Sequence, residues 1–216
     1  MKGNIEIKIC GITSVEEAEL LVEEKVDYAG LVLFYEKSKR NNTVKQAEDI
    51  LQFFREKKEQ GQQVKTVAVA VSPTKEQVGR IEDMGFDYIQ IHGSLEKEVL
   101  DSIHIPLFRA VWAKDEKLPD KIKECDNTEA LLFDGLIPGA GEVFDWKLME
   151  EVRRELEGFP VKIILAGGLT PENVKEAIKA VSPHIVDVSS GVEFDRDKVG
   201  KDPEKIRRFV REARKG

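Results

Sequence analysis

The chain has 216 residues and a formal net charge of −7, and Asp, Glu, Lys and Arg make up 35% of it. The length suits one large domain with a substantial core, whereas the acidic balance argues against a nucleic-acid-binding protein, which usually presents a basic face. No apolar stretch approaches the roughly 20 residues of a membrane span, so neither a nucleic acid nor a membrane is an expected partner.

Short apolar runs recur along the whole chain and predict β-strands. They are apolar at consecutive positions, which is typical of parallel strands covered on both faces. The expected strands are Ile5–Ile9, Tyr28–Phe34, Lys65–Val71, Tyr88–Ile91, Leu107–Val111, Ala130–Phe133, Val161–Leu165 and Ile185–Val188.

The segments between these runs have helical periodicity, and several begin with a residue that caps helices well. Ser14 is the expected cap of a helix that runs to Lys25, and Glu17 is spaced to complete a capping box. The other expected helices follow the caps Thr43, Thr74 and Asp145, occupy Leu95–Ser102 and Asp120–Glu124, or begin at the cap–proline pairs Thr170-Pro171 and Asp202-Pro203.

Eight strand–helix units predict an α/β fold, a (β/α)8 TIM barrel with a parallel eight-stranded core, formed by residues 1–216 as a single domain. The alternative is an open doubly wound sheet, which more often has fewer strands and one binding crevice. Reactive side chains follow strands along the whole of this chain. A barrel gathers all those strand ends into one ring, so the barrel is favoured.

Two glycine-containing segments follow the last two expected strands and predict a phosphate site. Gly167 and Gly168 come after the seventh strand, and Ser189, Ser190 and Gly191 come after the eighth. Phosphate groups often bind at these two loops of a barrel, where glycine lets backbone N–H groups approach the anion. Either segment alone also fits an ordinary turn. Their joint occurrence favours a substrate with a phosphate monoester.

Cys10 ends the first expected strand and is a candidate catalytic base. A free thiol has a pKa of about 8.5, so it needs a nearby positive charge or a helix N-terminus to act near neutral pH. Lys8 lies two positions earlier and shares its side of the strand, but the sequence leaves open whether that side faces inward. A small buried hydrophobe is the alternative role for such a cysteine.

Two aspartates stand at or near strand ends. Asp134 follows the apolar run Ala130–Phe133, where partial desolvation would raise the pKa of its carboxyl and suit a general acid. Asp187 interrupts the last strand and is expected to face the barrel interior, where it would hold a substrate hydroxyl or orient another side chain. Helix capping for Asp134 and a structural role for Asp187 remain alternatives.

Arg40 and His92 are the remaining candidates for substrate binding. Arg40 lies in the basic loop after the second strand, and a guanidinium there can bind a carboxylate through two hydrogen bonds. His92 ends the fourth strand, where a hydrogen-bonded structural histidine is the alternative.

The sequence indicates neither a metal nor a cofactor, because no H-x-x-x-H pair and no Rossmann or Walker motif is present. Its two cysteines, Cys10 and Cys125, are too few for a disulfide framework, and the N-terminal residues do not resemble a signal peptide. We therefore expect a reduced, cytoplasmic protein. A monomer and a homodimer are both compatible with the sequence.

The motifs together resemble the phosphoribosylanthranilate isomerase family of tryptophan biosynthesis, over essentially the whole chain. The first and last are the most specific. They are Lys8–Thr13, Ser38–Arg40, Ile89–Gly93, Leu131–Asp134, Phe144–Trp146, Leu165–Leu169 and Val186–Glu193.

The resemblance implies an enzyme without cofactor or metal that isomerises its phosphoribosyl substrate by an Amadori rearrangement. It assigns the general base to Cys10 and the general acid to Asp134. It places Arg40 at the anthranilate end and the last two loops at the phosphate. A related isomerase of histidine biosynthesis, which uses two aspartates, and a barrel that only binds a phosphorylated ligand are the alternatives.

One segment departs from the family pattern. The family usually has a G-G-[ST]-G loop before its Phe-Asp-Trp motif, whereas this chain has Pro138-Gly139-Ala140-Gly141-Glu142. Proline fixes the backbone φ angle, and the hydroxyl of the family residue is lost. Contacts between this loop and the substrate are therefore expected to differ.

Overall fold

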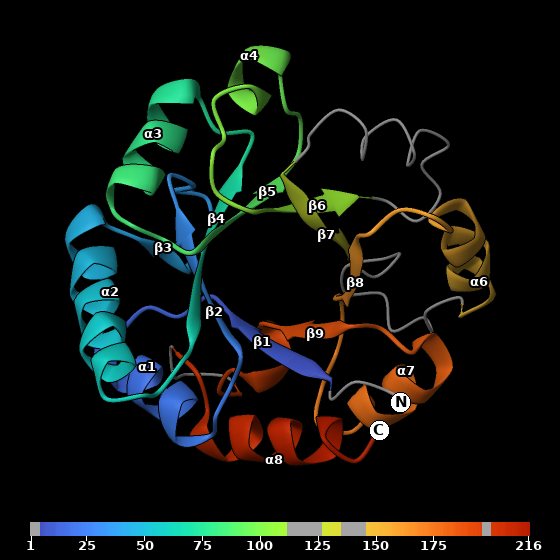
Figure 1. The fold of residues 1–216 in the computed structure, drawn as a ribbon. Helices are drawn as coiled ribbons and strands as arrows, with labels where there is room; N and C mark the ends of the chain where they lie inside the picture. The colour runs from blue at the N-terminus through green and yellow to red at the C-terminus, as the bar shows by residue number, and fades with distance from the viewer. Residues whose placement is uncertain (1–4, 112–126, 135–145, 196–199) are drawn as a thin grey trace.

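The computed structural model describes residues 5–111, 127–134, 146–195 and 200–216 (Figure 1). Within them, eight parallel strands close into a barrel, because the first strand pairs with both the second and the last. The barrel strands are β1 (Glu6–Cys10), β2 (Tyr28–Leu33), β4 (Lys65–Val71), β5 (Tyr88–His92), β6 (Leu107–Val111), β7 (Thr128–Phe133), β8 (Lys162–Leu165) and β9 (Ile185–Val188). The predicted barrel is confirmed, with strand bounds within two residues of those expected.

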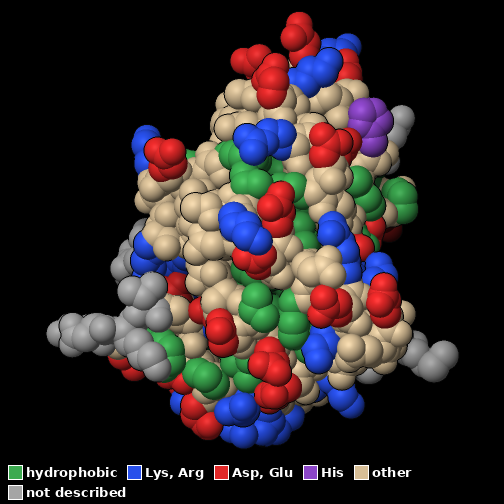
Figure 2. All heavy atoms as spheres, turned by 90° about the vertical axis from the view of Figure 1, so that its left-hand side faces the viewer, with side chains coloured by type: hydrophobic (Ala, Val, Ile, Leu, Met, Phe, Trp, Pro, Cys, Tyr) green, Lys and Arg blue, Asp and Glu red, His purple; other side chains and the backbone are tan. Residues whose placement is uncertain are grey.

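Helices surround the barrel on its outside (Figure 1). They are α1 (Val15–Glu23), α2 (Val44–Glu59), α3 (Lys75–Asp83), α4 (Lys97–Leu100), α6 (Trp146–Glu155), α7 (Val174–Val181) and α8 (Pro203–Ala213), together with the short 3-10 helix η1 (Ser190–Val192). Charged side chains of both signs are scattered over the face that carries α1, α2 and α3 (Figure 2). These helices thus bury one side against the barrel and present the other to solvent.

Helix starts follow the predicted caps in most places. Thr43 and Thr74 each form a complete capping box, and Asp202 caps α8 with Pro203 at its first position. Ser14 caps α1 as expected, but the carboxylate of Glu17 accepts the N–H of Thr13 at 2.7 Å, so the expected capping box is not completed there.

Two expectations about secondary structure were wrong. The helix expected to start at Thr170 begins instead at Val174, since residues 171–173 form a turn whose Asn173 side chain accepts the N–H of Thr170. The two-residue strand β3 (Asn41–Asn42), which pairs with β2, was not expected, because polar Asn-Asn has no strand signal. The helix expected at Asp120–Glu124 lies outside the described residues.

The amino end of the barrel is filled by aromatic rings and covered by ion pairs. Tyr28, Tyr88 and Phe108 pack with ring centroids 4.8–5.6 Å apart. The Tyr28 hydroxyl donates to Glu6 at 3.2 Å, and the Lys162 ammonium donates to the other carboxylate oxygen of Glu6 at 3.1 Å. Among the described residues, side chains thus fill the amino end of the barrel.

Candidate active site

The side chains of Lys8 and Cys10 both point into the barrel at its carboxyl end. They are two residues apart on β1 and so share one face of the strand. Gly30 of β2 pairs with Cys10, and a Cβ atom at Gly30 would lie 3.0 Å from the Lys8 ammonium and 3.1 Å from the Cys10 sulfur. The orientation that the sequence left open is thus inward, and glycine at position 30 leaves the space in which these two atoms meet.

Lys8 is fully buried and forms an ion pair with Asp187. Its Nζ atom lies 3.0 Å from Oδ2 of Asp187, which stands opposite it in the register of β1 and β9. Burial acts to lower the pKa of Lys8, but the carboxylate of Asp187 and the interaction with the Cys10 side chain outweigh it and raise the pKa above its ordinary value. Oδ1 of Asp187 is also buried and accepts no hydrogen bond from the described residues.

Cys10 lies between opposing electrostatic influences. Burial raises the pKa of its thiol above the ordinary value, and the carboxylate of Asp187 adds to this effect. The ammonium groups of Lys8 and Lys201 act in the opposite direction. Burial and Asp187 thus favour the thiol form of Cys10, whereas the two lysines favour its anion.

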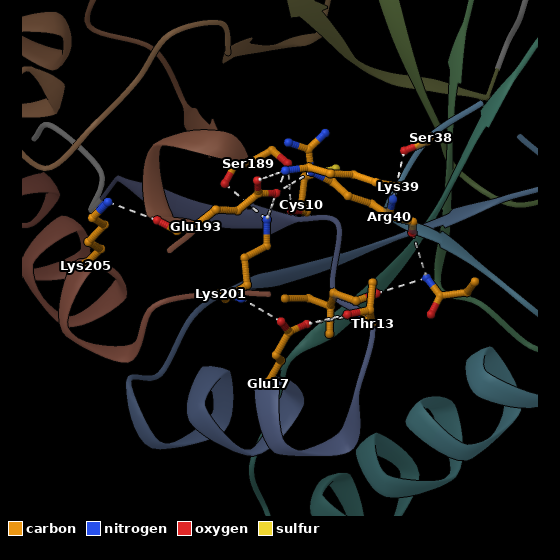
Figure 3. A network of polar contacts seen from close by, with 12 residues as sticks. Cys10, Thr13, Glu17, Ser38, Lys39, Arg40, Ser189, Glu193, Lys201 and Lys205 are labelled. Carbon is orange, nitrogen blue, oxygen red and sulfur yellow. Dashed lines mark hydrogen bonds and ion pairs between the residues drawn. The ribbon is translucent and has the colours of Figure 1, made fainter. Parts of the chain in front are cut away.

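A charged network lies beside Cys10 and joins three separate segments of the chain (Figure 3). Glu193, which follows η1, accepts hydrogen bonds from the guanidinium of Arg40 and from the ammonium of Lys39, the latter at 2.8 Å. Burial acts to raise the pKa of Glu193, but these two hydrogen bonds, together with the positive charges of Lys201 and Arg40, overcome it and hold the pKa at about 2. Glu193 is therefore an anion at any physiological pH and fixes Arg40 over the site.

Arg40 crosses above the turn that follows β1. Gly11 has a φ of +80°, and a Cβ atom there would lie 2.4 Å from the side chain of Arg40. A residue with a side chain would thus be strained in its backbone and would collide with the arginine. The glycine of the Cys-Gly pair lets the guanidinium of Arg40 reach the carboxyl end of β1.

Lys201 links the network to Cys10 and to the last strand. Its side chain is 1% exposed, and its ammonium donates to the backbone carbonyl of Ser189 at 3.1 Å and lies 3.4 Å from Glu193. The Ser189 hydroxyl in turn donates to the carbonyl of Cys10 at 3.0 Å, and the N–H of Lys201 donates to Glu17 at 2.7 Å (Figure 3). Burial lowers the pKa of Lys201.

The two glycine-containing loops predicted to bind phosphate lie against each other. A Cβ atom at Gly191 would lie 1.9 Å from the carbonyl oxygen of Leu169, so only glycine allows the loops after β8 and β9 to meet. Val192 and Glu193 donate the backbone hydrogen bonds of η1, which leaves the N–H groups of Ser190 and Gly191 unused by that helix. Gly167 and Gly168 both have positive φ, and Gly168 borders open space.

His92 stands at the end of β5 as a partly buried, neutral imidazole. Burial and the positive charges of Lys8 and Arg109 lower its pKa to about 4, against a weaker opposite effect of Asp187. Its Nε2 atom lies 2.8 Å from the amide nitrogen of Gln90, which acts as the donor when the ring is neutral. Arg109 of β6 is fixed nearby, because its guanidinium donates to the carbonyls of Ile91 and Gly93.

Asp134 follows the last residue of β7, at the same end of the barrel as Cys10. It is exposed, so the desolvation expected for its carboxyl is not found. It stands one residue beyond buried Phe133, the last residue of β7. Cys125 and the atypical segment Pro138–Glu142 lie outside the described residues.

The parallel barrel brings every predicted site residue to its carboxyl end. Lys201, Glu193 and Arg109 add charged groups that reasoning from composition and strand ends did not select, although Glu193 belongs to one of the quoted motifs. Among residues 5–111, 127–134, 146–195 and 200–216, no group of three or more His, Cys, Asp or Glu side chains is placed to hold a metal ion. No helix in those ranges is long and apolar enough to cross a membrane.

Comparison with known proteins identifies the family to which this arrangement belongs. Residues 7–212 match the family of N-(5′-phosphoribosyl)anthranilate (PRA) isomerases. The chain belongs to the PRA isomerase family. It is 38% identical over 212 residues to the N-(5′-phosphoribosyl)anthranilate isomerase of Streptococcus mutans, covering 97% of this chain and 98% of that protein. The resemblance and the enzyme class predicted from sequence are thus confirmed.

Solved structures of PRA isomerases have the same barrel. The enzyme from Thermotoga maritima superposes with a TM-score of 0.78 at 33% identity, covering 97% of this chain and 98% of that one. A PRA isomerase in complex with reduced 1-(o-carboxyphenylamino)-1-deoxyribulose 5-phosphate superposes with a TM-score of 0.75 at 32% identity, with the same coverage.

Proposed function

We propose that this protein converts N-(5′-phosphoribosyl)anthranilate to 1-(2-carboxyphenylamino)-1-deoxyribulose 5-phosphate, a step of tryptophan biosynthesis. The observation that carries the proposal is the match of nearly the whole chain to PRA isomerases, one of which is solved with a reduced form of this product. The cluster around Cys10 supports it, since a thiol, two ammonium groups and a carboxylate meet at the reactive end of the barrel.

The first step is opening of the furanose ring with Asp134 as the general acid. Its carboxyl gives a proton to the ring oxygen, the bond between that oxygen and C1′ breaks, and the electron pair of the anthranilate nitrogen forms a C1′=N double bond. An exposed carboxyl at the strand end can take its proton back from solvent between turnovers. Substrate binding would have to desolvate this carboxyl, because a raised pKa favours the protonated form that the step needs.

The second step is removal of the C2′ proton by the Cys10 thiolate. The pair of electrons from the C2′–H bond forms a C1′=C2′ double bond, and the C=N electrons return to nitrogen, which yields an enolamine. This species tautomerises to the 2′-ketone when C1′ gains a proton and the 2′-hydroxyl loses one. No electrons enter or leave the substrate, so the balanced reaction is an isomerisation with no need of a redox partner.

The remaining site residues bind the two ends of the substrate. The guanidinium of Arg40, fixed by Glu193, binds the anthranilate carboxylate. The unused N–H groups of Ser190 and Gly191, with the loop of Gly167 and Gly168, bind the phosphate.

Two further side chains, buried Asp187 and partly buried His92, suit the sugar hydroxyls. The unpartnered Oδ1 of Asp187 accepts a hydrogen bond from a sugar hydroxyl. Neutral His92 can serve as a donor or an acceptor without adding charge to the site. Both assignments place uncharged substrate groups against side chains that the fold already holds in position.

Turnover of phosphoribosylanthranilate by the purified protein, followed by the change in anthranilate fluorescence, tests the proposal. We expect Cys10→Ala and Asp134→Asn each to lower kcat by about 10²–10⁴, the usual contribution of a general acid or base, while substrate still binds. A near-normal rate in either variant would remove that residue's role. Inorganic phosphate should compete with substrate, and a failure to compete at high concentration would count against the phosphate site.

A further inference from the structure

The buried ammonium of Lys8 is a charged group at the carboxyl end to which the proposed reaction gives no task. It is 0% exposed and makes its ion pair inside the barrel. Replacing a buried ion pair by apolar side chains is often neutral or stabilising, so stability alone is a weak reason for the pair. The position of the Lys8 ammonium beside the sulfur of Cys10 offers a functional reason.

We propose that Lys8 is a positioning residue for the general base: its ammonium, held in place by Asp187, stabilises the thiolate of Cys10 over the thiol. This rests on the proposed role of Cys10 and adds a residue to it. The geometry consists of the shared inward face of β1, the 3.0 Å ion pair, and the glycine at position 30 whose missing side chain leaves Nζ and Sγ facing the same space.

Asp187 is needed for this role but opposes it in part. Without the carboxylate, a fully buried lysine would tend to lose its proton, since burial lowers its pKa. With the carboxylate present, Lys8 stays charged, although the same carboxylate disfavours a thiolate at Cys10. For Cys10 the influence of Lys8 is larger than that of Asp187, so the pair as a unit favours the thiolate.

Other charged groups face Cys10 and must be kept constant in a test. Lys201 acts on the thiol in the same direction as Lys8, from the segment that precedes α8. Glu193 and Arg40 act on Lys201, with opposite signs. His92, on β5, faces Lys8 from across the barrel, and the charge of Lys8 lowers its pKa. His92 is therefore a second, independent reporter of the Lys8 charge.

The pH dependence of alkylation by iodoacetamide measures the pKa of the Cys10 thiol without any turnover. All variants carry Cys125→Ser, which leaves Cys10 as the single cysteine. Lys8→Met should move the midpoint upward by about one pH unit or more, so that alkylation at neutral pH falls about tenfold, because an opposite charge at this range shifts a pKa by roughly 1–3 units.

The double variant Lys8→Met/Asp187→Asn guards against loss of folding, because it leaves no unpaired buried charge. Its midpoint should lie above that of the parent and below that of Lys8→Met. In Lys8→Met the pKa of His92, measured by NMR of its ring protons, should rise because a neighbouring positive charge is gone. A folded Lys8→Met or double variant whose alkylation midpoint is not above that of the parent would overturn the proposal.

This experiment separates the proposal from the proposed function. If Lys8→Met shifts the thiol pKa but Cys10→Ala remains active, the electrostatic coupling holds and the base assignment fails. If Cys10→Ala is inactive but Lys8→Met leaves the thiol pKa unchanged, the base assignment holds and Lys8 has no positioning role.

Discussion

The two ends of the barrel use charge in different ways. At the amino end, Glu6, Lys65 and Lys162 keep 28–42% of their side chains exposed and pair over a layer of aromatic rings. At the carboxyl end, Lys8, Asp187 and Lys201 are buried at 0–7% exposure and surround a thiol. Removing an exposed ion pair changes the free energy of unfolding little. A buried charge that loses its partner, in contrast, strongly destabilises the folded protein. The amino end is thus tolerant of substitution and the carboxyl end is not.

The largest expected effect comes from replacing one lysine at each end by methionine. Lys8→Met leaves the carboxylate of Asp187 buried without its partner and should lower the free energy of unfolding by about 3–5 kcal/mol. Lys162→Met, the matched control, should lower it by about 1 kcal/mol or less and leave turnover unchanged. Urea denaturation measures both. Equal losses in the two variants would remove the distinction between the ends.

Glycine substitutions should show the same contrast between the site and the outer surface. Gly191→Ala places a methyl group 1.9 Å from the carbonyl oxygen of Leu169, so the two phosphate loops must separate. We expect a loss of about 1–3 kcal/mol in unfolding free energy and weaker inhibition by inorganic phosphate. Gly79→Ala, in α3 with no atom within 4 Å, should instead stabilise by up to about 1 kcal/mol. Unchanged phosphate inhibition in Gly191→Ala would contradict the placement of the phosphate.

Removal of the Glu193 charge should affect substrate binding more than chemistry. Glu193→Gln loosens Arg40, so KM should rise several-fold with a smaller change in kcat. The pKa of Glu193 is lowered from about 4.5 to about 2, so its ionisation stabilises the folded protein above pH 4.5, and this contribution is lost as the pH falls toward 2. Acid denaturation should show the variant less stable at pH 7 and equal to the parent near pH 2. A fall in kcat alone would point to a different role.

The smallest expected effect is at the amino end. Tyr28→Phe removes the hydrogen bond from the tyrosine hydroxyl to Glu6 and keeps the aromatic packing. We expect a loss of about 1 kcal/mol in unfolding free energy and no change in kcat or KM, measured by thermal denaturation and by the fluorescence assay. A large effect on turnover would show that the two ends are coupled through the barrel interior.

The barrel itself was predictable because each of its strands is a short apolar run between polar helices. Helix starts were predictable where the capping side chain sets the first residue of the helix, as at Thr43 and Asp202. At Thr170 the prediction failed because Asn173 bonds back to the same loop and delays the helix. A cap–proline pair therefore does not show whether a side chain three residues later will hold the loop in a turn and delay the start of the helix.

The site was predictable only in part, for reasons of geometry. A period of two put Lys8 and Cys10 on one face, but the direction of that face depends on how the sheet closes. Lys201 lies in a polar stretch, yet it is buried, and its N–H is bonded to Glu17, 184 residues earlier. Contacts that far apart in the sequence leave no trace in composition or periodicity.

The hydrogen bond from Ser189 to the carbonyl of Cys10 has a consequence for the order in which the protein acquires its reactivity. On a growing polypeptide, the first strand is made long before the last one exists, and until then its thiol is an ordinary cysteine in water. Docking of the final strand brings the carboxylate of Asp187, the hydroxyl of Ser189 and, just after it in the chain, the ammonium of Lys201 to this thiol together. Chemical labelling of that one sulfur during synthesis would therefore report the moment at which the barrel closes.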